Sequence, residues 1–154
     1  MHSDGQLCFL IIDGEHARLV RPDINHELHT VNSFDSVSAH RASHEIASDR
    51  PGRSFESATT TRHAIGPQQD PHDLEKSKFA NFVADVVSRA ADGGAFNRLV
   101  LVAPSHCLQE IEGSLEARTA AMVIGRLAKD LVKLPDHDLS SHLRKWVPPP
   151  RRAS

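Results

Sequence analysis

Two uninterrupted apolar runs, Leu7–Ile12 and Leu99–Ala103, constrain the fold more than any other feature of this sequence. Each run is too short for a core helix, and neither alternates polar with apolar residues as a strand with one wet face does. Such runs are typical of strands buried on both faces, as in sheets covered by helices. The 154 residues suffice for one domain with a sizeable core. We therefore predict a single α/β domain with a mixed sheet.

The first run begins a predicted three-stranded antiparallel meander. Asp13-Gly14 is a turn signal after the first strand, and Ala17–Arg21 predicts the second strand. Pro22 to His26 interrupts the pattern, and Glu27 to Phe34 predicts a third strand with imperfect alternation.

A long helix is expected to follow residue 70. Asp70 is a suitable N-cap, Pro71 suits the first helical position, and the Asp73 carboxylate complements the helix dipole. Gly93-Gly94 is expected to end the helix. Between these signals, one core-facing apolar stripe repeats at helical spacing: Phe79, Phe82, Val83, Val86, Val87 and Ala90.

The remaining elements are expected to be shorter. Ser105 is predicted to cap a helix through Ile111, and Ser114 to cap a further helical turn through Ala120. Met122 to Leu127 is either a strand or the end of that helix, because its periodicity fits both. Pro135 to Lys145 predicts a last short helix.

Residues 36–70 form a polar segment with little apolar periodicity, and a loop of this length in a small domain usually has a function or is disordered. Its centre reads Arg50-Pro51-Gly52-Arg53, and Pro-Gly fits the middle of a type II turn. Such a turn brings the two arginines within about 7 Å at Cα. Two neighbouring guanidinium groups suit a phosphate or carboxylate clamp. The alternative is that they bind the chain's own acids, such as Asp49 or Glu56, and pin the loop.

Metal chemistry has weak support in the sequence. His63, Asp70 and His72 match no standard zinc spacing, and a role in anchoring the loop is favoured for the two histidines. His40 and His44 would pair only on a helix.

Two further positions have chemical potential. Asp13 ends the first strand, where nucleases with a ribonuclease-H-like sheet place a metal-binding carboxylate, and Asp130 lies near a predicted strand end. A hairpin turn at Asp13 is the favoured interpretation. Ser105 with His106 lacks the pattern of a nucleophile elbow, so a capping role is favoured for this serine.

Composition limits the classes of function. The net charge is −2, so the chain has no global basic field, and any nucleic-acid binding must come from a local patch. Cys8 and Cys107 lie in apolar runs, which indicates buried, reduced thiols in a cytoplasmic protein. The N-terminus has neither a signal peptide nor a membrane span. We expect one domain over residues 1–146 and a disordered tail over 147–154. The last dozen residues are basic and contain Trp146, a composition compatible with RNA contact but more often a solvated terminus.

Several motifs together resemble the bacterial host-attachment protein family over Leu7 to Leu143. The motifs, in order, are Ile12–Leu19, Ser48–Phe55, Arg62-His63-Ala64, Asp70-Pro71-His72, Arg98–Pro104 and Lys129-Asp130-Leu131. The family is in turn remotely similar to the central α/β domain of archaeal and eukaryotic peptide-chain release factors, which implies ribonuclease-H-like layering.

The release-factor resemblance bears on the long polar segment. In those factors a loop before a long helix carries a Gly-Gly-Gln tip that enters the ribosomal peptidyl-transferase centre. Residues 36–70 of this chain correspond to that loop and contain no Gly-Gly-Gln. The resemblance therefore implies binding to ribosomal or transfer RNA, without peptidyl-tRNA hydrolysis by the standard route.

We accordingly expect a cytoplasmic anion- or RNA-binding module rather than an enzyme, with no cofactor, no metal and no catalytic residue. The expected anion-binding residues are Arg50, Arg53, Arg62 and His63, and the expected loop-supporting residues are Asp49, Ser54, Asp70 and His72. The expected partners are the ribosome or tRNA, and no membrane. The alternatives are a metal-assisted hydrolase or nuclease that uses Asp13 or the region of His63 and His72, and a non-enzymatic homodimer.

Overall fold

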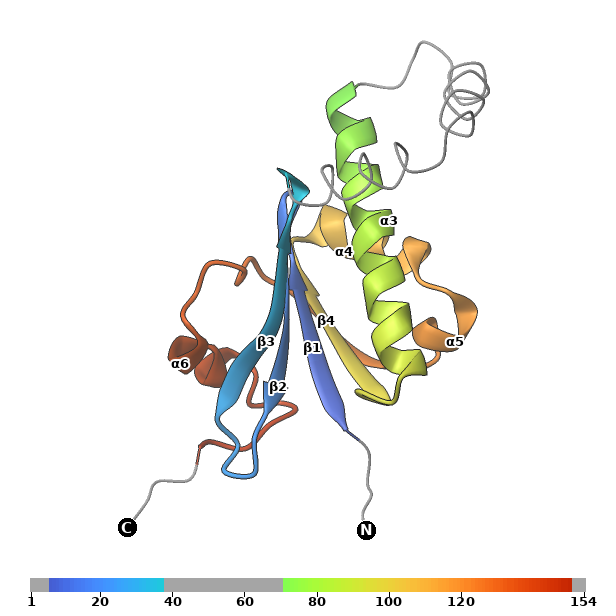
Figure 1. The fold of residues 1–154 in the computed structure, drawn as a ribbon. Coiled ribbons are helices and arrows are strands. Elements are labelled where there is room, and N and C mark those ends of the chain that lie inside the picture. The colour runs from blue at the N-terminus through green and yellow to red at the C-terminus, as the bar shows by residue number, and fades with distance from the viewer. Residues whose placement is uncertain (1–5, 38–70, 151–154) are drawn as a thin grey trace.

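The structure is a computed structural model that describes residues 6–37 and 71–150. Five strands form one sheet in the order β3-β2-β1-β4-β5 (Figure 1). Their bounds are Leu7–Ile12 for β1, His16–Pro22 for β2, Leu28–Asp35 for β3, Arg98–Ala103 for β4 and Val123–Ala128 for β5. β2 pairs antiparallel with β1 and β3, whereas β1, β4 and β5 are parallel. The predicted mixed sheet and its opening meander are confirmed.

Among the described residues, the helices α3, α4 and α5 cover one face of the sheet (Figure 1). Their bounds are Pro71–Asp92 for α3, Ser105–Ser114 for α4 and Ala117–Ala120 for α5. The apolar stripe of α3, including Phe79, Val83 and Val87, packs in one buried cluster with Leu10 of β1 and Leu101 of β4. The helical spacing of the stripe therefore predicts its buried face correctly.

The C-terminal segment covers the other face of the sheet. It contains α6 (Asp136–Leu139) and a 3₁₀ turn, η1 (Ser140–His142). Leu139, Leu143 and Val147 join a second buried cluster with Phe9 and Val100. β1 and β4 thus lie between two apolar layers, which explains why their sequences are apolar throughout. Val147 is buried, so the packed part of the chain includes this residue.

Some local predictions were wrong. The helix predicted to begin with Ser105 as its cap instead has Pro104 at that position, without a side-chain cap, and Ser105 is its first residue. Ser114 does not cap the next helix: its hydroxyl donates to the Glu110 carbonyl at 3.0 Å, and Glu116 holds the cap position. The last helix is shorter than Pro135–Lys145, because a 3₁₀ turn follows its first four residues.

Two predictions about burial and membranes can be compared with the structure. Cys8 and Cys107 are buried free thiols, as predicted, and burial raises the pKa of the Cys8 thiol to about 12. Among the helices of the described ranges, none has both the length and the apolar character that crossing a bilayer requires.

Candidate functional site

The carboxyl ends of four strands lie along the same side of the sheet, which we call the carboxyl edge. Because β2 is antiparallel to both of its neighbours, β3 runs in the same direction as β1, β4 and β5. Asp13, Ser36, Pro104 and Lys129 therefore follow strands that end at this edge. Ligands of open α/β sheets bind outside the carboxyl ends of the strands, so this edge is the first place to look for a site.

The polar segment that the sequence singles out is inserted at this edge. β3 ends and α3 begins toward the same end of the molecule (Figure 1). The Ser36 amide donates to the Glu15 carbonyl at 2.8 Å, which holds the exit of β3 against the turn between β1 and β2. The insertion is therefore tied to the sheet at its first residues.

The residues of the predicted clamp lie outside the described residues. This applies to Arg50, Arg53, Arg62 and His63, and to the supporting residues Asp49, Ser54 and Asp70. His72 lies in the first turn of α3, where the structure describes the backbone alone. The predicted clamp and its support therefore stay predictions, and so does the metal-binding alternative that uses His63 and His72.

Asp13 forms a hairpin turn, as favoured from the sequence. Its Oδ1 accepts hydrogen bonds from the amides of Glu15 at 2.8 Å and His16 at 2.7 Å. Its own amide donates to the His16 carbonyl at 2.8 Å. This oxygen of the carboxylate is therefore used to close the turn between β1 and β2, which weakens the nuclease alternative that requires it as a metal ligand.

A pocket of about 420 Å³ opens at the same edge, next to the exit of β3. We call it the edge pocket. Its walls are residues 16–18 of β2, residues 33–35 of β3, and the pair Val132 and Lys133 from the C-terminal segment. The pocket therefore combines a buried apolar side chain, Val132, with polar groups from three segments.

Arg18 fixes the wall of the edge pocket that the C-terminal segment supplies. Its guanidinium donates to the carbonyls of Leu131, at 2.9 Å, and Leu134, and to the Asp136 carboxylate at 3.2 Å. The amide and hydroxyl of Thr30 on β3 also donate to Asp136. This network spans more than a hundred residues of sequence and joins the start of the C-terminal segment to the sheet.

The ionisation of the network follows from its partial burial. Burial lowers the pKa of Arg18, and the nearby Asp136 carboxylate opposes that shift. Burial raises the pKa of Asp136, but hydrogen bonds from Thr30 and the charge of Arg18 outweigh burial and hold this pKa below its ordinary value. The lowered pKa keeps the Asp136 carboxylate ionised at neutral pH, and a guanidinium group is not deprotonated in proteins. The Arg18 side chain is only 11% exposed, and its Nε is a buried donor without a partner.

This network was not predicted from the sequence. A signal was present, because Arg18 interrupts the otherwise apolar residues Ala17, Leu19 and Val20 of β2. The distant partner Asp136 could not be found from spacing, since the contact depends on how the C-terminal segment crosses the sheet.

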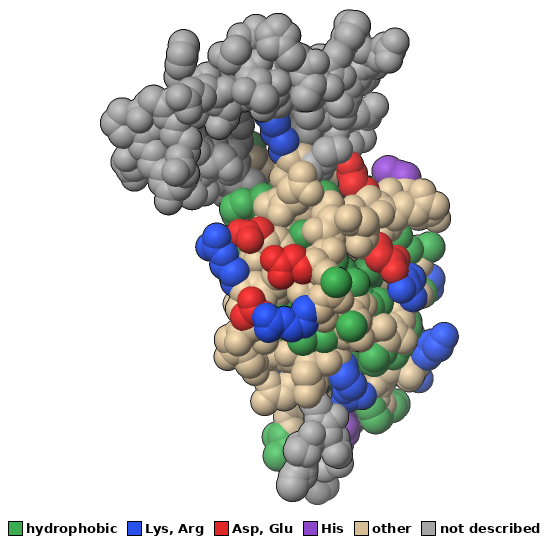
Figure 2. Space-filling model, turned by 90° about the vertical axis from the view of Figure 1, so that its right-hand side faces the viewer, with side chains coloured by type: hydrophobic (Ala, Val, Ile, Leu, Met, Phe, Trp, Pro, Cys, Tyr) green, Lys and Arg blue, Asp and Glu red, His purple; other side chains and the backbone are tan. Residues whose placement is uncertain are grey.

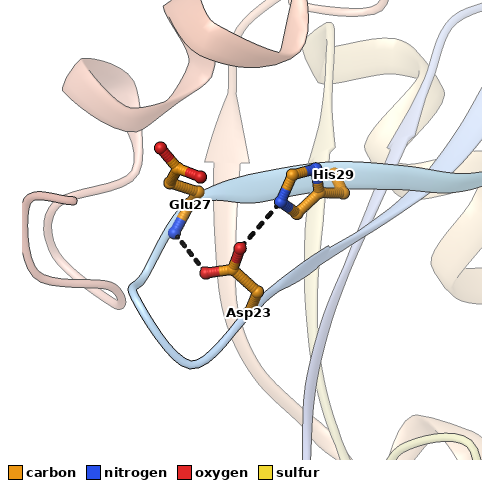
Figure 3. Close-up of side chains that lie close together, drawn as sticks. All are labelled: Asp23, Glu27 and His29. Carbon is orange, nitrogen blue, oxygen red and sulfur yellow. Dashed lines mark hydrogen bonds and ion pairs between the residues drawn. The ribbon is translucent and has the colours of Figure 1, made fainter. Parts of the chain in front are cut away.

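Within the described part of the chain, one group of three side chains has metal-ligand chemistry: Asp23, Glu27 and His29 (Figure 3). They lie at the turn between β2 and β3, which is the opposite edge of the sheet from the edge pocket. The Asp23 carboxylate accepts from the amides of Asn25 and Glu27 at 2.8 and 3.0 Å and contacts His29 Nε2 at 2.9 Å. The hydrogen bond to His29 lowers the pKa of Asp23, and the same bond raises the pKa of His29. All three residues are exposed, and these contacts account for the cluster as a closure of the hairpin.

The helical side of the molecule has a mixed surface. Figure 2 shows Lys and Arg side chains interspersed with Asp and Glu on the side formed by α3, α4 and α5. Arg89 pairs with Asp85, Arg118 with Asp92, and Arg126 with Glu112. Charges that neutralise one another in this way do not favour the binding of a polyanion to this surface. The carboxyl edge of the sheet is therefore the better candidate for a binding site.

The three layers and the mixed sheet define a class of α/β domain in which one sheet is covered on both faces. The crystal structure of an archaeal translation termination factor superposes with a TM-score of 0.50 and 10% identity, over 89% of this chain and 34% of that chain. A second solved structure, described as an archaeal protein, gives a TM-score of 0.49 and 12% identity, over 92% of this chain and 34% of that chain. The chain thus spans about a third of the length of either structure. The predicted similarity of fold to a release factor is confirmed.

The family follows from the sequence itself. A family model described as "Protein required for attachment to host cells" matches residues 8–143. The chain therefore belongs to the host-attachment family, as the motifs predicted. A search of curated proteins gives no match.

Proposed function

We propose that this protein is an anion-binding module that associates with ribosomal or transfer RNA and does not hydrolyse peptidyl-tRNA. The observation that supports the proposal is the place of the insertion, which begins after β3 at the carboxyl edge of the sheet. The fold is shared with an archaeal translation termination factor, and a role in translation suits the proposed RNA partner. A cytoplasmic location is part of the proposal, because translation takes place there.

The proposed clamp consists of Arg50 and Arg53, with Arg62 and His63 beside them. A guanidinium group binds phosphate oxygens in a bidentate manner, and two such groups on one turn address a phosphate of an RNA backbone. Asp49, Ser54, Asp70 and His72 are proposed to support the segment. Binding is proposed without catalysis, because the insertion lacks Gly-Gly-Gln.

A salt series tests the proposed clamp. Association with purified ribosomes and with single-stranded RNA is measured for the wild type and for Arg50→Ala/Arg53→Ala between low and physiological salt. If the two arginines neutralise two phosphates, the slope of log K against log salt is expected to fall by about 1.4 for single-stranded RNA.

The matched control removes two arginines from the mixed surface, Arg89→Ala/Arg118→Ala, each of which has an acidic partner. This variant is expected to keep the wild-type slope. Equal slopes for the wild type and the Arg50/Arg53 variant would contradict the proposal.

A further inference from the structure

We propose that the edge pocket binds a single ribonucleotide, holding the phosphate at Lys133 and the ribose hydroxyl groups at Asp35. The proposal rests on the proposed RNA binding only for the source of the nucleotide, which is either the 3′-terminal residue of an RNA or a free mononucleotide. The two sources offer the same ribose and base together with a phosphate, which is a diester in the RNA and a monoester in the mononucleotide.

The volume and the lining residues of the edge pocket suit such a ligand. Its volume of about 420 Å³ lies within the range of sites for small organic ligands. Val132, a buried apolar residue, and Arg18 both line the pocket. The guanidinium of Arg18 is held by two carbonyls and Asp136, so the part of the pocket lined by Arg18 is preorganised.

The polar groups of the pocket come from different segments. Lys133 is an exposed ammonium on the C-terminal segment, and Ser33 adds a hydroxyl from β3. Asp35 is half-buried and is the last residue of β3. An acidic side chain that accepts from ribose hydroxyls near the end of a strand is a recurrent device of nucleotide-binding α/β folds. Asp35 has another interaction in the structure, but a carboxylate has about four lone-pair positions and can accept further hydrogen bonds.

The pairing of a cation with a carboxylate favours a nucleotide over a simple anion. An isolated phosphate or sulfate ion would be attracted by Lys133 and repelled by Asp35. A nucleotide satisfies both groups, because its phosphate is an anion and its ribose hydroxyls are donors. The lining of the pocket therefore selects for a ligand that presents both.

Three probes test the pocket on the full chain: AMP, 2′-deoxy-AMP and adenosine. Binding is measured by calorimetry and by chemical shifts of residues 16–18 and 33–35. The wild type is expected to bind AMP about tenfold more tightly than either of the other two probes, since each lacks one hydrogen-bonded or charged group.

Two variants test which side chain contacts the ribose and which contacts the phosphate. Asp35→Ala is expected to remove the preference for AMP over 2′-deoxy-AMP, and Lys133→Ala to remove the preference for AMP over adenosine. The controls are Asp138→Ala and Lys78→Ala, at exposed positions outside the pocket, and both should keep the wild-type preferences. Equal binding of AMP and 2′-deoxy-AMP by the wild type, or no binding of AMP at millimolar concentration, would overturn the proposal.

Two oligonucleotides distinguish the sources of the ligand. Displacement of AMP by an RNA with a 3′-hydroxyl, but not by the same RNA with a 3′-phosphate, supports the RNA end as the ligand. Displacement by neither RNA, with AMP binding intact, supports a free nucleotide.

The Arg50→Ala/Arg53→Ala variant separates this proposal from the proposed clamp, because AMP binding should persist in it. Salt-dependent RNA association without AMP binding would overturn the pocket alone, and AMP binding with unchanged RNA association in the arginine variant would overturn the clamp alone.

Discussion

Gly125 on β5 is a residue at which one carbon atom decides local packing. A Cβ built at this position would lie 2.5 Å from Trp146 Nε1 and 2.6 Å from Trp146 Cζ2. The indole also makes an edge contact with Phe9 of β1, with ring centroids 6.3 Å apart, so it has little room to move away. Glycine therefore allows the tryptophan to cover the edge of the second core cluster.

Gly125→Ala is expected to destabilise the protein by about 1–3 kcal/mol, because the added methyl displaces a packed indole. Urea unfolding followed by tryptophan fluorescence measures the change. Gly113→Ala on α4 is the matched control: no atom lies within 4 Å of its added Cβ, and alanine favours a helix. Comparable destabilisation of both variants would show that the indole contact is not the cause.

Arg18 is a second position at which one side chain serves several groups. Arg18→Met keeps the apolar stem but leaves the carbonyls of Leu131 and Leu134 and the Asp136 carboxylate without their cationic donor. We expect a loss of about 2–3 kcal/mol in the free energy of unfolding. Arg89→Met removes an exposed helical ion pair and should change stability by less than about 0.5 kcal/mol. A loss at Arg18 as small as that at Arg89 would refute the structural role.

At the scale of elements, the attachment of α6 to β3 depends on an ionised carboxylate. The pKa of Asp136 is below its ordinary value of 3.8 in the folded protein. A carboxyl group with a lowered folded-state pKa stabilises the fold above its unfolded pKa, and this contribution is lost as the pH falls through the folded-state pKa.

The wild type is therefore expected to lose stability as the pH falls below about 4, and Asp136→Asn to show a shallower dependence in that range while being less stable at neutral pH. Chemical unfolding at a series of pH values from 2 to 7 measures both effects. Glu15→Gln, at an exposed position in the turn between β1 and β2, serves as the control. Parallel curves for the wild type and Asp136→Asn would contradict the assignment.

The elements also show what the sequence could predict. β1 and β4 were found because burial on both faces requires an unbroken apolar run, and α3 because its stripe repeats at helical spacing. β5 was ambiguous because the periodicity of Met122–Leu127 fits both a strand and a helix, although in the structure its residues alternate between half-buried and exposed. The spacing of four residues between Leu139 and Leu143 suggested a longer helix. In the structure a short helix and a 3₁₀ turn bury both side chains instead.

The predicted clamp lies outside the described residues and stays a prediction. The insertion that contains it is recognisable in the sequence because it lacks apolar periodicity. The edge pocket was not predictable, because Lys133 and Val132 meet β2 and β3 only through the path of the C-terminal segment. Local patterns do not contain a contact of this sequence separation.

At the scale of the whole molecule, the C-terminal segment acts as a third layer. A chain that ends at Ser140 lacks Leu143, Trp146 and Val147, all of which belong to or pack against the second core cluster. Buried Leu and Val side chains contribute about 1.5–3 kcal/mol each, so their loss removes much of the stability of a small domain. We expect this truncation to abolish cooperative thermal unfolding, whereas a chain that ends at Pro148 should keep the wild-type Tm. A cooperative, wild-type-like transition in the shorter chain would contradict the third layer.

The two outer strands of the sheet, β3 and β5, are both irregular. Val31 falls in the register shift between β2 and β3, and Ile124 in the shift between β4 and β5. These two residues are 56% and 46% exposed, so each apolar side chain lies where the edge is bulged. Bulged edges are poor templates for pairing with another strand. The predicted homodimer stays untested, and this irregularity disfavours its formation through continuous sheets.

The parallel pairing of β1 with β4 also has a consequence for the order of folding. Leu7 pairs with Arg98, so the first strand made during synthesis waits for most of the chain before its second neighbour exists. The meander of β1, β2 and β3 can form early through local contacts, but its two apolar faces remain uncovered until the helices and the C-terminal segment follow. Closing a loop of this length costs entropy that grows only slowly with its length. We therefore expect that shortening the insertion changes the folding rate far less than a mutation that weakens the β1–β4 pairing.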